Sequence, residues 1–136
     1  NGRVISTAWQ LIAHPGVLSG SYLAGRRRRY VHPAKLFMGS AFIAFSVGSS
    51  WGTFAIMIPI AVPIATTLGL PAPLMLGAAV SGAIFGDHAS PISDTTVLAS
   101  MASATDHIDH VRTQLPYALL AAGMTAIGLL IIGLIM

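Results

Sequence analysis

The residues best suited to chemistry lie in one short stretch, GDHASPISDTT at positions 86–96. It holds two carboxylates, an imidazole and four hydroxyl groups within eleven residues. Carboxylates, hydroxyls and the carbonyls of an unwound backbone are oxygen ligands that a hard monovalent cation such as sodium requires, and a carboxylate can take up a proton instead. The stretch therefore predicts a site for a small cation or a proton.

Long apolar segments flank this stretch on both sides. From position 36 to position 86 the sequence contains neither a charged residue nor a histidine. Placing an ionised carboxylate at the centre of a bilayer costs about 2.5 to 3.5 kcal/mol on insertion scales. A carboxylate kept between such segments indicates a function.

Exchange follows if a cation and a proton compete for one carboxylate. Burial favours the neutral form of a carboxyl group, whereas a bound cation favours the charged form. Asp94 or Asp87 is expected to be the competing group, and His88 is a candidate proton relay. Replacing either aspartate with Asn is expected to abolish sodium-driven proton movement.

The backbone of this stretch is expected to be interrupted. Gly86 and Pro91 disfavour a continuous helix, and an unwound backbone at membrane depth persists only where protein buries it or where it lines a wet cavity. A second interpretation is compatible with the first: Ser93 or Asp94 caps the helix that follows.

The composition indicates that these residues are positioned by membrane helices. The 136 residues are 54% hydrophobic and only 8% charged. We predict an all-α, polytopic membrane protein that is an excerpt of a longer chain. The absence of Cys excludes disulfides and thiolate metal sites. The net charge of +3 comes mainly from Arg26 to Arg29, which indicate a topological anchor rather than a nucleic-acid partner.

One membrane-transport domain is predicted over residues 1–136. The segment 36–70 is too long for one crossing of ~20 residues and too short for two with a loop, so a break is expected at the Ser/Gly cluster 46–53. The predicted parts are a partial or kinked transmembrane segment (4–24), a basic loop (25–35), a re-entrant hairpin (36–70), a discontinuous or broken helix (71–103), a polar loop (104–114) and a transmembrane helix (115–136).

Glycines at both interruptions have an alternative explanation. Gly48 and Gly52 are spaced as in a GxxxG packing motif, and Gly82 and Gly86 share that spacing. Two interrupted segments in succession, each with Ser or Thr at its break, nevertheless favour facing halves of one site.

A second polar cluster, DHIDH at 106–110, has the spacing of metal ligands on one helical face. We interpret it as a solvated loop that precedes the last helix. Trp51 is expected to fill space or line a substrate path rather than bind a cofactor.

Three blocks resemble NhaC-type sodium/proton antiporters of the ion-transporter superfamily. They are SWGTFAIMIPIAVPIA (50–65), SGAIFGDHASPISDTTVLAS (81–100) and DHIDHVRTQLPYALL (106–120), and TAWQLIAHPGVLSGSYLAG (7–25) is more weakly similar. Where the family pattern has GTSWGT, this sequence has GSSWGT, which still supplies a hydroxyl.

The resemblance implies the C-terminal half of such a protein, a second inverted repeat with a re-entrant hairpin and a broken helix. It implies a prokaryotic plasma-membrane transporter, not an enzyme, that moves Na+ and H+ without a cofactor. The partners would be the missing N-terminal repeat, membrane lipids and a second copy in a homodimer. The implied site residues are Ser49, Ser50 and Thr53 at the hairpin tip, and Asp87, Ser90, Ser93, Asp94 and Thr95 at the broken helix.

Two other functions are compatible with the residues. Relatives of this family exchange organic anions or amino acids with sodium or protons on similar scaffolds. An intramembrane metalloenzyme could instead use Asp87, His88 and the 106–110 cluster around a divalent ion.

Overall fold

The computed structural model describes residues 32–135, and the regular secondary structure of these residues is entirely helical. This confirms the all-α class over the described range. The predicted segment 4–24 and most of the 25–35 loop lie outside it. The helices are α3 (Pro33–Val47), α4 (Ser50–Leu68), α5 (Ala72–Ala89), α6 (Asp94–Ala102) and α7 (His107–Ile135).

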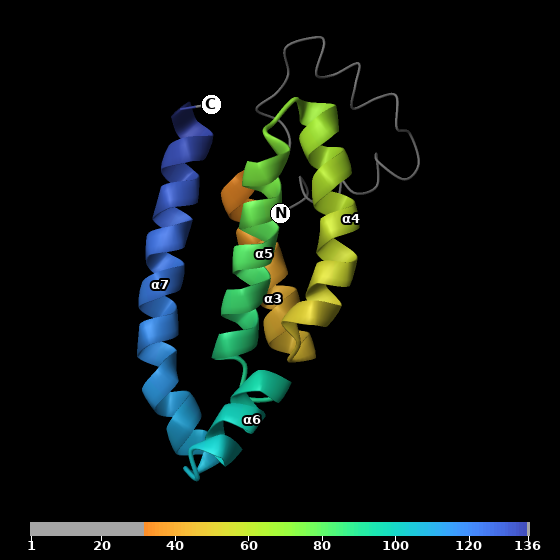
Figure 1. Ribbon diagram of the computed structural model, residues 1–136. Helices are drawn as coiled ribbons and strands as arrows, with labels where there is room; N and C mark the ends of the chain where they lie inside the picture. The colour runs from red at the N-terminus through yellow and green to blue at the C-terminus, as the bar shows by residue number, and fades with distance from the viewer. Residues whose placement is uncertain (1–31, 136) are drawn as a thin grey trace.

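The helices form an up-and-down arrangement. In Figure 1, α3 and α4 run antiparallel as a hairpin, α5 returns beside α3, α6 extends beyond the lower end of α5, and α7 runs back along the bundle. The two short connections at the bundle's lower end, 90–93 and 103–106, therefore lie on the same side as the hairpin turn at 48–49.

The hairpin turn is narrower than the predicted break at 46–53. Gly48 ends α3 with a φ of 71°, and the Ser49 side chain caps α4 by accepting the N–H of Gly52 at 3.5 Å. Because that cap starts α4 at once, the polar residues 50–53 form its first turn and do not extend the loop. At the other end, His32 caps α3 and Pro33 is its first residue, so Lys35 belongs to α3 rather than to the basic loop.

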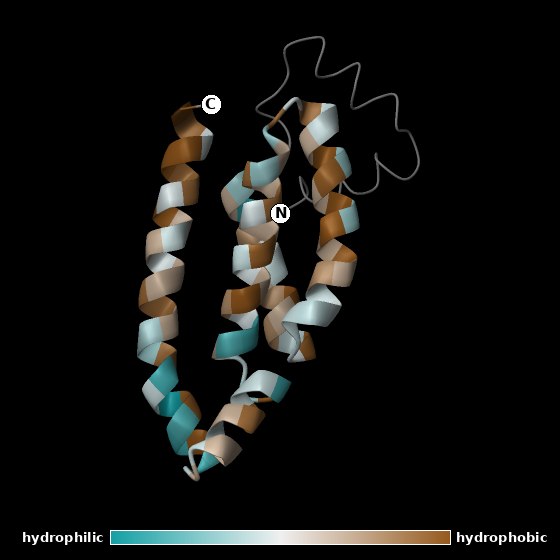
Figure 2. Ribbon diagram, viewed as in Figure 1, coloured by the Kyte–Doolittle hydropathy of each residue, from teal (hydrophilic) through white to brown (hydrophobic). Residues whose placement is uncertain are grey.

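Two helices are long and apolar enough to cross a membrane. They are α4, with 19 residues and a mean hydropathy of 1.6 over an 18-residue window, and α7, with 29 residues and a mean hydropathy of 2.5 over such a window. Helix α3 is apolar but shorter, with 15 residues. Figure 2 shows that hydrophilic residues gather at the lower end of the bundle, in the first turns of α7 and at the end of α5.

Helices α3 and α5 pack with their backbones in close contact. A Cβ at Gly82 would overlap the carbonyl oxygen of Phe37, and a Cβ at Gly86 would overlap that of Ala41. The packing explanation of these two glycines is confirmed, and the expectation that Gly86 interrupts the helix is wrong, because α5 continues to Ala89. Gly48 does not pack one helix against another as a GxxxG motif would, since it lies in the turn between α3 and α4.

The predicted loop 104–114 and the predicted start of the last helix at 115 are also wrong. Asp106 Oδ1 accepts the N–H groups of Ile108 and Asp109 at 2.9 and 3.2 Å. These bonds satisfy donors that the first turn of a helix leaves free, so α7 begins at His107. The connection between α6 and α7 is therefore short.

Candidate functional site

Asp87 is the centre of the candidate site. Its side chain is buried, with 1% of its surface exposed, in the last turn of α5. Three hydroxyl groups contact the carboxylate: Ser93 Oγ lies 2.6 Å from Oδ1, Thr95 Oγ1 lies 3.0 Å from Oδ2, and Ser50 Oγ lies 3.2 Å from Oδ2. Four predicted site residues from two separate predicted segments are thus brought together.

Each hydroxyl comes from the beginning of a helix. Ser50 is the first residue of α4, Ser93 is the N-cap of α6, and Thr95 lies in the first turn of α6. Helix N-termini carry partial positive charge and stabilise nearby anions. Two such termini therefore meet one buried carboxylate.

The turn at 48–49 and the break at 90–93, which supply these helix ends, are hydrogen-bonded to each other. Ser90 Oγ donates to the carbonyl of Phe45 at 2.8 Å, and the N–H of Asp94 donates to the carbonyl of Gly48 at 3.3 Å. A Cβ at Gly48 would lie 2.7 Å from the carbonyl oxygen of Ile92, so the close approach of turn and break needs glycine there. Residues 90–93 form the break between α5 and α6.

The buried carboxylate has no basic partner among residues 32–135. The one ion pair within 4 Å in this range joins Arg112 to Asp109 at 3.8 Å, and both side chains are exposed. His88 follows Asp87 directly, but its ring is exposed and its Nδ1 lies 2.9 Å from the carbonyl of Ile84. Within residues 32–135, the side-chain contacts of Asp87 are with hydroxyl groups.

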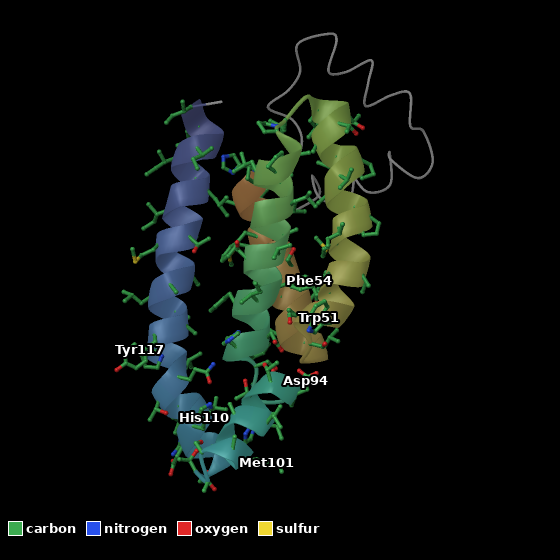
Figure 3. All side chains as sticks on the ribbon, viewed as in Figure 1. Trp51, Phe54, Asp94, Met101, His110 and Tyr117 are labelled. Carbon is green, nitrogen blue, oxygen red and sulfur yellow. The ribbon has the colours of Figure 1, made fainter. Side chains whose placement is uncertain are left out.

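The other predicted site residues lie around this centre without reaching it. Asp94 is exposed at the start of α6, below the base of α4 in Figure 3, and its Oδ1 accepts its neighbour's N–H at 2.7 Å. Thr53 is buried and donates to the carbonyl of Ser49 at 2.9 Å. Of the two proposed caps, Ser93 is the one observed, since it accepts the N–H of Thr96 at 3.4 Å.

His88 lines a groove on another face of α5. The groove has a volume of about 430 Å³ and lies between α5 and α7. Its polar lining includes Ser81, Gln114 and Tyr117, and its apolar lining includes Phe85. The structure therefore separates the candidate relay from the carboxylate that it would serve.

Sequence reasoning missed the part played by α7. His107 reaches the break between α5 and α6, where its Nε2 lies 2.6 Å from the carbonyl oxygen of Pro91. The two aspartates of the 106–110 cluster act on α7 itself, with Asp106 at its cap and Asp109 in the exposed ion pair. No group of three or more metal-binding side chains occurs within the described range.

Comparison with known proteins gives a consistent picture. Residues 10–134 match the Na+/H+ antiporter family. The chain is 46% identical over 122 residues to an uncharacterized protein of Haemophilus influenzae, covering 87% of this chain and 23% of that protein. It is 35% identical over 135 residues to the malate-2H+/Na+-lactate antiporter of Bacillus subtilis, covering 90% of this chain and 29% of that protein.

A third relative carries the NhaC name. Over 86 residues the chain is 38% identical to the Na+/H+ antiporter NhaC of Alkalihalophilus pseudofirmus, covering 63% of this chain and 19% of that protein. The chain spans about a quarter of the length of the first two relatives. No solved structure matches.

Proposed function

Because the chain belongs to the Na+/H+ antiporter family, as its NhaC-type motifs predict, we propose that it is part of a secondary transporter that exchanges sodium for protons. Asp87 is the group that sodium and the proton occupy in turn. The observation that carries this proposal is a buried carboxylate held by three hydroxyls, with no basic partner in the described range.

The absence of a basic partner for Asp87 within residues 32–135 is the first support for alternate occupancy. A buried ionised carboxylate without a positive partner is unfavourable, and the free energy is recovered when a proton or a cation binds. Basic residues meet this need in many proteins by forming a permanent ion pair. No basic residue among residues 32–135 takes that position, so it is open to a mobile charge, as exchange requires.

The hydrogen-bond pattern is the second support. Ser93 Oγ and Thr95 Oγ1 lie 2.8 Å apart in addition to their contacts with Asp87, and Ser50 adds a further contact. These four close oxygen contacts need four protons, whereas the three hydroxyls supply three. A protonated Asp87 provides the fourth, and an ionised Asp87 leaves hydroxyl lone pairs available to sodium.

The remaining site residues are proposed to complete the site with the rest of the transporter. Asp94 is exposed beside the meeting point of the two interruptions, so its carboxylate is accessible to a segment outside this chain. Ser49, Ser90 and Thr53 shape the turn and the break through their caps and backbone contacts. The relay role of His88 stays a prediction.

We propose that this chain is the second inverted repeat, with 33–68 as a re-entrant hairpin and 72–102 as a broken helix. Its partners would be the first repeat of the same transporter, membrane lipids and a second copy, and no nucleic acid. The bacterial origin of the relatives supports a multi-pass protein of a prokaryotic plasma membrane. It would be a transporter rather than an enzyme.

Flux measurements on the complete transporter in proteoliposomes test this function. Sodium alone is expected to change the internal pH, in a direction set by the sodium gradient and without any organic solute. The similarity to the malate-2H+/Na+-lactate antiporter supports a second candidate, exchange of an organic anion. Proton movement that appears only when a carboxylic acid is added would favour that candidate and contradict cation exchange.

Ser93→Ala is expected to raise the apparent KM for sodium by at least about tenfold. A hydrogen bond to a charged group contributes about 1.5 to 3 kcal/mol and a lost N-cap costs about 1 kcal/mol, while tenfold corresponds to about 1.4 kcal/mol. Ser103→Ala is the matched control at the other end of α6, where the hydroxyl contacts the helix carbonyls of Ala99 and Ser100 and the hydroxyl of Thr105, all away from Asp87. Equal KM values for the two variants would contradict a role for Ser93 at the site.

A further inference from the structure

We propose that His107 is a positioning residue for the Asp87 site, acting from α7 on the break between α5 and α6. This inference rests on the proposed function. The Nε2 atom of His107 lies 2.6 Å from the carbonyl oxygen of Pro91, sixteen residues earlier in the chain. Its Nδ1 atom lies 3.2 Å from Ser100 Oγ on α6.

The chemistry of these partners assigns the ring protons. A carbonyl oxygen only accepts hydrogen bonds, so Nε2 carries hydrogen and donates to Pro91. In the neutral ring Nδ1 is then an acceptor that faces the Ser100 hydroxyl, whose single proton is shared with the nearer carbonyl of Val97 at 2.8 Å. The hydrogen bond to Pro91 is the stronger of the two, because it is shorter and because the Pro91 carbonyl accepts no other hydrogen bond within residues 32–135.

The carbonyl of Pro91 is the group that most needs such a partner. It lies in the break, where the helical hydrogen-bond ladder has ended, and within residues 32–135 its bond to His107 is the one that satisfies it. Two residues later, Ser93 donates to Asp87 at 2.6 Å and caps α6. His107 therefore fixes the loop that presents Ser93 to the carboxylate.

The break is held from two sides. The hairpin holds it through the carbonyls of Phe45 and Gly48, which bond Ser90 and Asp94. Helix α7 holds it through His107. Loss of the contact between His107 and Pro91 leaves Asp87 and Ser50 in place but loosens Ser93 and Thr95. The affinity for sodium then falls although the carboxylate is still present.

A purely structural role for His107 would look different. The contact with Ser100 joins α6 to α7 near their connecting loop. If joining these helices were its whole contribution, substitutions would change the amount of folded transporter or its maximal rate. A positioning role changes the apparent KM for sodium and leaves the maximal rate nearly unchanged.

A pair of variants of similar length separates the two roles in the complete transporter. His107→Gln keeps an N–H donor at about the reach of Nε2, whereas His107→Met has similar length and no donor. Loss of one hydrogen bond corresponds to about a fivefold to tenfold change in an equilibrium constant. His107→Met is therefore expected to raise the apparent KM for sodium about fivefold to tenfold, and His107→Gln is expected to stay close to wild type.

A matched control and a second variant complete the test. Arg112→Gln alters an exposed side chain about one and a half turns along α7 and is expected to leave both kinetic constants unchanged. If His107→Met does not accumulate in membranes, His107→Asn replaces it, since its amide is too short to reach Pro91. A wild-type KM in the donor-free variant, or an equal loss of maximal rate in the Gln and Met variants, would overturn the proposal.

Failure here is distinguishable from failure of the proposed function. Asp87→Asn is measured in the same vesicles. Wild-type exchange by that variant would remove the proposed function itself. An inactive Asp87→Asn variant together with a wild-type KM in His107→Met would remove only the role of His107.

Discussion

Asp87→Asn is expected to abolish sodium-driven proton movement, with a loss of at least about 100-fold and no loss of inserted protein. Asn has nearly the same shape and can still contact the hydroxyls of Ser50 and Ser93, but it cannot carry the negative charge that holds sodium or exchange it for a proton. Removing one member of a buried charge pair typically costs about 3 to 5 kcal/mol, and 1.4 kcal/mol corresponds to about tenfold. The measurement is sodium-dependent pH change in proteoliposomes.

Asp109→Asn is the matched control for that experiment. Asp109 is exposed and pairs with Arg112 at 3.8 Å on the surface of α7, where such pairs contribute little. The exchange rate of the Asp109→Asn variant is expected to remain near wild type.

The Asp94→Asn variant is expected to reduce exchange less than Asp87→Asn, because Asp94 is exposed in the described range. The sequence alone predicted that the two substitutions would be equally damaging. Wild-type exchange by Asp87→Asn would contradict the assignment of the site.

Gly86→Ala is expected to lower the stability of the folded transporter by at least about 1 to 3 kcal/mol, the usual cost of overpacking. The new Cβ would overlap the carbonyl oxygen of Ala41, and a Cβ–Cβ clash with Ala44 adds to the strain. Since backbone atoms cannot move aside as a flexible side chain can, α3 must separate from α5. Asp87 follows directly, so sodium affinity should fall as well. Thermal melting of the purified protein in detergent measures the loss.

Gly77→Ala tests the same change on the same helix without the clash. A Cβ at Gly77 meets nothing within 4 Å. Alanine is the better helix former by about 1 kcal/mol, so this variant is expected to be as stable as wild type or slightly more so. Equal stability of the Gly86 and Gly77 variants would show that the close packing of α3 on α5 is not important.

Several features of the fold follow from local chemistry and could be predicted. The break at 90–93 arises where Pro91 cannot continue a helix and Ser93 can cap the next one. The meeting of Ser50 with Asp87 was anticipated only as two facing interruptions, because sequence indicates which segments are broken but not the distances between them.

Other features depend on tertiary contacts and could not be predicted. From the sequence alone, Gly86 is expected to break the helix. In the structure α5 continues through Gly86, where the lack of a side chain lets the α3 backbone pack closely against α5. That continuation places Asp87 on the buried side of the last turn of α5, whereas Asp94 begins a new helix and stays exposed. The contact from His107 to Pro91 joins residues on either side of α6, so no local pattern reveals it.

Alternate occupancy of Asp87 is tested most directly by proton release. Sodium is added to the purified complete transporter in a weakly buffered detergent solution, and released protons are counted with a pH indicator. Wild-type protein is expected to release protons in proportion to the sodium bound, and Asp87→Asn is expected to release none. Sodium binding without proton release, or equal release by the variant, would contradict competition at this carboxylate.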